Sequence, residues 1–157
     1  MKKYIFTAVF CLLTAVSVCA QSKKSAQVSK LYQNYIAIKS ALASDDADKT
    51  SKASSDFIKT AYAINAKTVP QKELNILKKE ALVISGTKNI SIQRKSFYQL
   101  SDYMIALTKE FRLSESPVYV QYCPMAEGSW LSNEKKVINP YYGSSMLSCG
   151  TVKAEIK

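Results

Sequence analysis

Four segments between residues 25 and 113 place apolar side chains at intervals of three and four residues, and this spacing constrains the fold more than any other feature. A helix with that period buries one face and leaves the other in water. Each apolar face is too narrow to be stable alone, and the connections are short, so the segments predict an up-and-down four-helix bundle. The four stripes are Val28, Leu31, Tyr35, Ile38 and Leu42; Ala53, Phe57, Ala61 and Ile64; Leu74, Leu77, Ala81 and Ile84; and Phe97, Leu100, Met104, Leu107 and Phe111.

Polar and turn-forming residues separate these stripes. The Ser-Asp-Asp cluster at residues 44–46 is expected to end the first helix and to cap the second, because its side-chain oxygens can accept hydrogen bonds from free backbone N–H groups. Residues 68–71 have the spacing of a capping box, with Pro70 in the first turn of the third helix. Gly86 is expected to end that helix.

The helical pattern stops at Ser114. Ser116 and Pro117 break it, and residues 118–122 form a short run of β-type residues. The tail beyond them holds three of the four glycines, three of the four prolines and the single tryptophan. The sequence therefore predicts a mainly α protein in which a helical bundle, residues 21–113, carries a small, irregular, β-containing C-terminal cap, residues 114–157, packed on it as one domain.

The first twenty residues have the composition of a secretory signal peptide. Lys2 and Lys3 precede an uncharged apolar stretch, and small side chains near Ala20 suit cleavage after about that residue. A lipid anchor on Cys19 is less favoured, because Val18 is bulkier than the residue usually found before a lipidated cysteine. We expect a periplasmic or secreted protein whose mature chain has no transmembrane helix.

Charge and composition exclude several classes of function. Histidine is absent, which removes the commonest catalytic base and every zinc site that needs imidazole. The formal charge of +10 falls to +8 without the signal peptide, because 20 basic residues then face 12 acidic ones. The lysines are spread thinly, with no dense run interleaved with aromatic residues, so we expect no nucleic-acid partner. We also expect no enzymatic activity, because a nucleophilic cysteine would lack its usual base.

Two sulfur-bearing pairs flank the tail. Cys123 and Met125 are two residues apart, and Met146 and Cys149 are three apart. Thiolates and thioethers together are soft ligands that favour Cu(I) or Ag(I) over hard cations. The same two cysteines, exported to an oxidising compartment, are also suited to a disulfide that would stabilise the fold by roughly 3.5 kcal/mol.

Both interpretations require the two cysteines to lie close together. Pro124 fixes a sharp bend after the predicted strand, and Asn139-Pro140 with Gly143 can turn the chain back. We therefore expect Cys123 and Cys149 within disulfide reach, with Met125 and Met146 close to them.

The tail consists of short motifs rich in aromatic, turn-forming and sulfur-bearing residues. They are residues 119–126, 130–132, 139–143 and 146–150, with 35–42, 45–46 and 93–101 upstream. In these motifs the chain resembles a domain family of unknown function that occurs in secreted Bacteroidetes proteins and as a C-terminal extension of copper/silver efflux (RND) periplasmic adaptor subunits. The resemblance covers nearly the whole mature chain, and its tail motifs are the specific ones.

The resemblance implies an association with heavy metals. By position it points to Cys123, Met125, Met146 and Cys149 as metal ligands. The segment around Cys123 also looks like the start of short heavy-metal-binding modules of copper pumps and adaptors. Those modules continue with His-Pro and a second cysteine pair, whereas residues 126–127 of this chain are Ala-Glu and no histidine exists.

Two hypotheses follow. In the first, the protein is an exported carrier, buffer or efflux accessory for Cu(I) or Ag(I), with Trp130 and Tyr141 shielding the site and an envelope efflux component as a candidate partner. In the second, it is a non-metal interaction module of the cell envelope whose tail is held by a Cys123–Cys149 disulfide.

Overall fold

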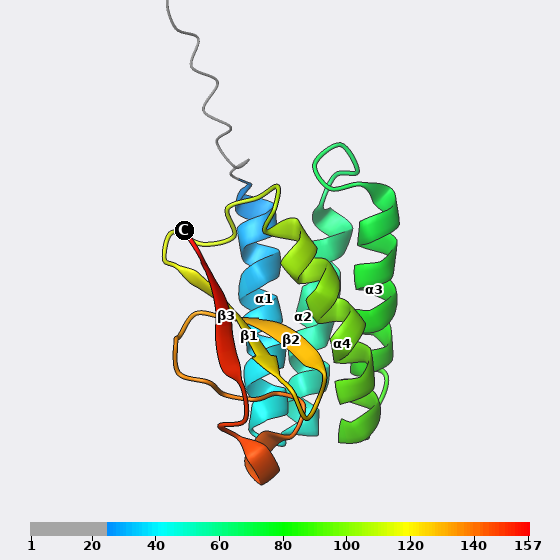
Figure 1. The fold of residues 1–157 in the computed structure, drawn as a ribbon. Helices are drawn as coiled ribbons and strands as arrows, with labels where there is room; N and C mark the ends of the chain where they lie inside the picture. The colour runs from blue at the N-terminus through cyan, green and yellow to red at the C-terminus, as the bar shows by residue number, and fades with distance from the viewer. Residues whose placement is uncertain (1–24) are drawn as a thin grey trace, which may run out of the picture.

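The computed structural model describes residues 25–157, and the predicted signal peptide lies outside them. Four helices come first, followed by a three-stranded antiparallel sheet with a short 3-10 helix (Figure 1). This confirms the predicted mainly α bundle with a β-containing cap. The helices are α1 Ala26–Ala43, α2 Ala47–Ala63, α3 Gln71–Ser85 and α4 Ile90–Leu107, and the cap comprises β1 Val118–Cys123, β2 Gly128–Ser132, η1 Gly143–Met146 and β3 Thr151–Ile156.

The helix ends agree with most, but not all, of the predicted caps. Asp46 caps α2 by accepting a hydrogen bond from the Lys49 N–H at 2.8 Å. Gly86 ends α3, and its N–H donates to the Leu82 carbonyl. The predicted capping box before α3 is wrong: Pro70 itself occupies the N-cap position, and no side chain caps the helix there. The proline side chain has no acceptor atom, so the free N–H groups of the first turn gain no side-chain cap from this position.

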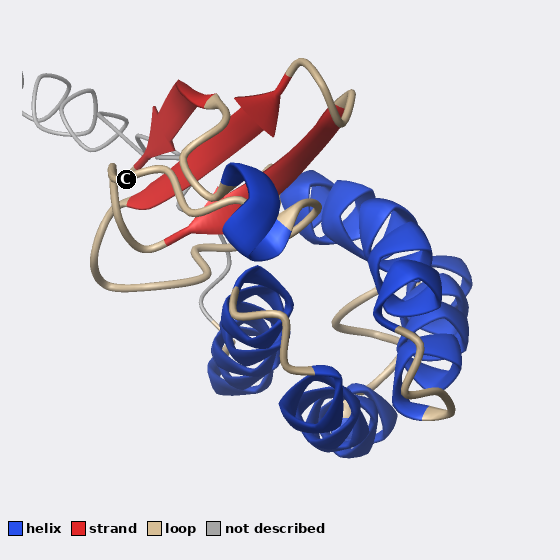
Figure 2. Cartoon of the chain, turned by 90° about the horizontal axis from the view of Figure 1, so that it is seen from below, coloured by secondary structure: helices blue, strands red, loops and turns tan. Residues whose placement is uncertain are grey.

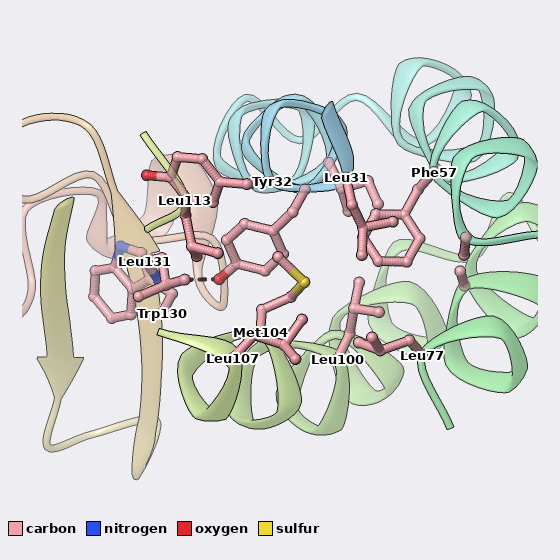
Figure 3. Packing of buried hydrophobic residues seen from close by; sticks show 14 of the residues in the cluster. Leu31, Tyr32, Phe57, Leu77, Leu100, Met104, Leu107, Leu113, Trp130 and Leu131 are labelled. Atoms are coloured by element: carbon pink, nitrogen blue, oxygen red, sulfur yellow. Dashed lines mark hydrogen bonds between the residues drawn. The ribbon is translucent and has the colours of Figure 1, made fainter. Parts of the chain in front are cut away.

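The apolar stripes form the core of the bundle. Apart from Ala53, which is half-buried, every stripe residue is at most 5% exposed. Figure 3 shows Leu31, Phe57, Leu77 and Leu100 meeting between the helices. The fourth helix ends at Leu107, earlier than its stripe, so the last stripe residue, Phe111, reaches the core from the turn that follows α4.

The sheet lies to one side of the helices, beside α1 and α4 (Figure 2). Its strand order is β2-β1-β3, and β2 is the strand that packs against the bundle. Trp130 and Leu131 of β2 are fully buried and belong to the same apolar cluster as the helical stripes. By contrast, β3 leaves its first five residues exposed, so backbone pairing with β1 holds it more than burial does.

A polar contact around Arg94 joins the cap to the turn between α1 and α2. The guanidinium donates to the Pro140 carbonyl at 2.9 Å, to the Leu42 carbonyl at 2.9 Å and to the Asp45 carboxylate. Asp45 also accepts a hydrogen bond from the Ser144 N–H of η1 at 2.9 Å. These contacts fix the loop that precedes Cys149.

None of the helices between residues 25 and 157 combines the length and the apolar character needed to cross a membrane.

Candidate functional site: the thiol pair of the cap

The fold brings Cys123 and Cys149 into contact. Cys123 is the last residue of β1, and Cys149 stands two residues before β3, which pairs with β1 in the sheet. Their Sγ atoms are 2.7 Å apart, and both cysteines are free thiols in the structure. The predicted proximity of the two sulfur atoms is confirmed. We call these two residues the thiol pair.

On the Cys123 side, a tight turn follows the strand. The Glu127 N–H donates to the Pro124 carbonyl at 3.3 Å, and Glu127 adopts a left-handed backbone conformation with φ 51°. Two tyrosines from other parts of the chain hold this turn. The Tyr142 hydroxyl donates to the Met125 carbonyl at 2.9 Å, and the Tyr98 hydroxyl of α4 donates to the Ala126 carbonyl at 3.0 Å.

On the Cys149 side, Asn139 organises the returning loop. Its N–H donates to the Leu147 carbonyl at 2.8 Å, and its side-chain amide donates to the Cys149 carbonyl at 3.0 Å. Its side-chain oxygen accepts from the Tyr141 N–H at 2.8 Å. Asn139 is fully buried, so these bonds satisfy an amide that would otherwise be costly to bury.

Gly150 lets the chain pass close to its neighbours directly after Cys149. Its φ is +138°, and a Cβ there would stand 2.8 Å from the Tyr122 carbonyl oxygen and 3.1 Å from the Trp130 ring. A side chain at this position would push Cys149 away from β1. Glycine is therefore needed for the thiol pair to meet.

The surroundings of the two thiols differ. Cys123 is completely buried and Cys149 is half-buried. Burial opposes ionisation of Cys123, but hydrogen bonds from the Cys149 thiol, from the backbone N–H groups of Ala126 and Met125 and from the Asn139 side chain outweigh it and lower the pKa of Cys123. The hydrogen bond to Cys123, with burial and the charge of its neighbour, raises the pKa of Cys149.

These opposite shifts favour the thiolate at Cys123 over the thiolate at Cys149. A thiolate is the form of cysteine that binds metals and attacks disulfides. Cys123 is accordingly the sulfur of the pair that favours the thiolate, and Cys149 is the more exposed of the two residues.

The two predicted methionine ligands lie in the segments that carry the thiols, but in different environments. Met125 is 65% exposed on the turn after Cys123. Met146 is half-buried at the end of η1, and its carbonyl accepts a hydrogen bond from the Cys149 N–H at 3.0 Å. Neither side chain is part of the apolar core. Within residues 25–157 no group of three or more histidine, cysteine, aspartate or glutamate side chains could hold a metal ion.

Two buried aromatic rings of the cap, Trp130 and Tyr141, belong to the same apolar cluster as Cys123. Trp130 is fully buried, Tyr141 is 6% exposed, and the two rings meet edge to face with centroids 5.8 Å apart. Tyr141 also stacks on Tyr98 at 4.0 Å and donates to the Ser129 carbonyl at 2.6 Å. The shielding role expected for Trp130 and Tyr141 stays a prediction.

Sequence reasoning did not identify the polar residues that support the site. Asn139 was expected only as part of a turn. The hydrogen bonds of Asn139, Tyr98 and Tyr142 join positions 10–28 residues apart along the chain. No local spacing in the sequence indicates contacts of that kind.

Comparison with known proteins gives one match. The model of a family described as "Protein of unknown function (DUF3347)" matches residues 31–116, a range that takes in most of α1 and all of α2, α3 and α4 and ends before β1. No curated protein and no solved structure matches the chain.

Proposed function

The chain belongs to the DUF3347 family of proteins of unknown function, and we propose that this member binds a soft monovalent metal ion, Cu(I) or Ag(I), at the thiol pair. The observation that carries the proposal is the contact between Cys123 and Cys149, in which the pKa of Cys123, a buried residue at the end of β1, is lowered. The protein would act outside the cytoplasm as a carrier, a buffer or an accessory of metal efflux.

The chemistry of the donors supports this choice of ion. Two thiolates suit Cu(I), which accepts low coordination numbers, and thioethers add soft donors without adding charge. The Met125 side chain is exposed beside the turn that holds Cys123, and Met146 lies one turn before Cys149. Either thioether could complete a third position on the ion. The backbone N–H groups that face Cys123 would stabilise the metal-bound thiolate as well as the free one.

Metal binding at this site would release protons. Cys149 retains its proton next to the Cys123 thiolate, so the ion must displace it to gain the second sulfur. We therefore expect the affinity for Cu(I) to rise with pH until both thiols have ionised.

A competition titration tests the proposal. The reduced protein is titrated with Cu(I) against a chromophoric Cu(I) chelator, beside the C123S/C149S double variant. We expect the wild-type protein to take Cu(I) from the chelator at a ratio of one ion per chain and the double variant to take none. Equal behaviour of the two proteins would show that the thiol pair is not a metal site. The variants M125L and M146L, which keep side-chain volume, then report which thioether contributes.

The same contact supports a second candidate, a structural disulfide in a non-metal interaction module. A bond between Cys123 and Cys149 would fasten the start of β3, a strand that is almost wholly exposed, to the end of β1. Free-thiol counting on protein taken directly from the cell envelope distinguishes the candidates. Two cysteines that are free or bound to a metal ion support the metal site. The absence of such thiols supports the structural disulfide.

A further inference from the structure

Lys39 is buried without a partner of opposite charge. It lies near the C-terminal end of α1 and is the only buried lysine or arginine among residues 25–157, with 6% of its surface exposed. In the described part of the chain, no hydrogen bond or ion pair reaches its ammonium group. The buried carboxylate of Glu80, by contrast, has the Lys79 ammonium 3.6 Å away. Lysine is rarely buried unless it is paired, because its ammonium loses hydration, so Lys39 lacks a partner that the described residues do not supply.

The Lys39 side chain lines a cavity of about 450 Å³ between α1 and the cap. The unpartnered side-chain atoms that are sealed from solvent in residues 25–157 do not include Lys39 Nζ, so this nitrogen remains accessible. The volume of the cavity is in the range of sites for small molecules. A small anion that enters the cavity could therefore contact the ammonium.

Two carboxylates also line the cavity, and neither forms an ion pair with Lys39. The Asp45 carboxylate accepts hydrogen bonds from the Arg94 guanidinium and the Ser144 N–H, so its charge is already compensated. Glu134 is exposed; burial lowers the pKa of Lys39, and the charge of Glu134 opposes this shift without cancelling it. The negative charge of Glu134 favours a ligand with one negative charge over a dianion such as phosphate, because a second charge would add repulsion.

The rest of the cavity wall suits an apolar group. Ala43 of α1 lines it beside Lys39, and Ile138 and Leu147 line it from the cap. Leu147 is 43% exposed, so an apolar chain lying against it would cover surface that is now in water.

We propose that the cavity binds a small monocarboxylate with a short apolar chain, its carboxylate on the Lys39 ammonium and its chain against Ile138 and Leu147. A hydrogen bond between two charged groups is strong where water is scarce. Neither cysteine of the thiol pair lines this cavity, so the inference goes beyond the proposed function and does not depend on it. A free short-chain acid and the C-terminal carboxylate of a peptide both have this chemistry.

Two lysines of α1 provide matched variants. K39M removes the buried ammonium and keeps an unbranched side chain. K30M makes the same change at an exposed position of the same helix that does not line the cavity. Because the charge of Lys39 is unpaired, K39M should be no less stable than the wild-type protein in chemical denaturation. A clear loss of stability in K39M, absent from K30M, would show that the ammonium has a structural partner and would overturn the proposal.

The binding experiment is a titration of the ¹⁵N-labelled protein with butanoate, followed by NMR. We expect saturable shifts of the Ala43 and Leu147 amide signals at millimolar butanoate. The affinity should fall at least about tenfold in K39M and remain unchanged in K30M. Butanamide, which has the same apolar chain and no charge, should not saturate the protein. Equal binding by K39M and the wild-type protein, or equal affinities for butanamide and butanoate, would show that Lys39 does not hold a carboxylate.

A parallel titration with N-acetyl-alanyl-alanine distinguishes the two sources of the carboxylate. Tighter binding of butanoate assigns the cavity to a free acid, and tighter binding of the peptide assigns it to a chain terminus. Either result, if it is lost in K39M, supports the carboxylate site. Failure of the wild-type protein to bind either probe overturns the proposal.

Discussion

The hydroxyl of Tyr35, in the middle of α1, accepts a hydrogen bond from the Leu131 N–H of β2 at 3.0 Å. The same hydroxyl contacts the Ser101 hydroxyl of α4 at 2.8 Å, and the Tyr35 side chain is completely buried. A single phenol therefore joins two helices of the bundle to the strand that carries the cap. Burial raises the pKa of Tyr35 above its ordinary value, so the group stays protonated and remains a hydrogen-bond partner at physiological pH.

Replacing Tyr35 by phenylalanine should destabilise the protein by about 1–3 kcal/mol, because the Leu131 N–H and the Ser101 hydroxyl would lose a partner in a region without access to water. Chemical denaturation followed by circular dichroism measures the change. Y62F is the control: Tyr62 is 64% exposed, so the loss of its hydroxyl should alter stability by less than about 0.5 kcal/mol. Equal effects of the two substitutions would contradict the role given to Tyr35.

An aspartate at Leu100 should prevent folding. Leu100 is fully buried in the apolar stripe of α4, and a carboxylate there would have neither water nor a counter-charge. We expect a loss of more than about 4 kcal/mol, seen as loss of helical circular dichroism. I92D introduces the same charge on the same helix at a side chain that is 46% exposed, and this variant should fold.

The helices and their buried faces were predictable because the three-to-four-residue spacing is a local property of the sequence. All four stripes lie in the core, and Asp46 caps α2 as expected. Element boundaries were less predictable. Phe111 continues the apolar spacing of α4, yet it follows the helix, since a buried position does not require a helical backbone.

The site was predictable only in part, for a related reason. Turn-forming residues and the two cysteines indicated that the ends of the tail must meet, and Cys123 and Cys149 do. The hydrogen bonds from Tyr98 and Tyr142 depend on how the sheet packs beside α4. That packing is a tertiary property, and neither the spacing of the tyrosines nor their neighbours in sequence specifies it.

The contact between Asp45 and the cap should depend on pH. Hydrogen bonds from Ser144, together with Arg94, lower the pKa of Asp45 from 3.8 to about 2. Because the pKa is lower in the folded state, the stabilisation is present above the ordinary pKa and is lost as the pH falls through about 2. Asparagine tolerates the backbone φ of 57° found at position 45, so D45N removes the charge without straining the turn. D45N should be less stable than the wild-type protein by about 0.5–1 kcal/mol at pH 7. The expected loss is small because the Asp45 side chain is partly exposed.

Denaturation of both proteins at several pH values measures this effect. The difference in stability between wild type and D45N should shrink between pH 4 and pH 2. Other carboxyl groups titrate in both proteins, so their contributions cancel in the comparison. A difference that stays constant over this range would show that the Asp45 carboxylate does not stabilise the fold through its charge.

The exchange of β3 with solvent should depend on the state of the thiol pair. Because β3 buries almost none of its side chains, its stability depends on pairing with β1 and on the attachment of its first residues. Oxidation to a disulfide would fix Cys149 to the end of β1, so we expect the β3 amides to exchange with solvent about tenfold more slowly in oxidised than in reduced protein. The amides of β2, which packs on the bundle, should exchange equally in both states.

Hydrogen exchange measured with and without a reductant tests this expectation. The C123S variant cannot form the bond, so its exchange should not respond to the reductant. If β3 exchanged equally in oxidised and reduced wild-type protein, its attachment would not depend on the Cys123–Cys149 bond, and the structural-disulfide candidate would lose its support.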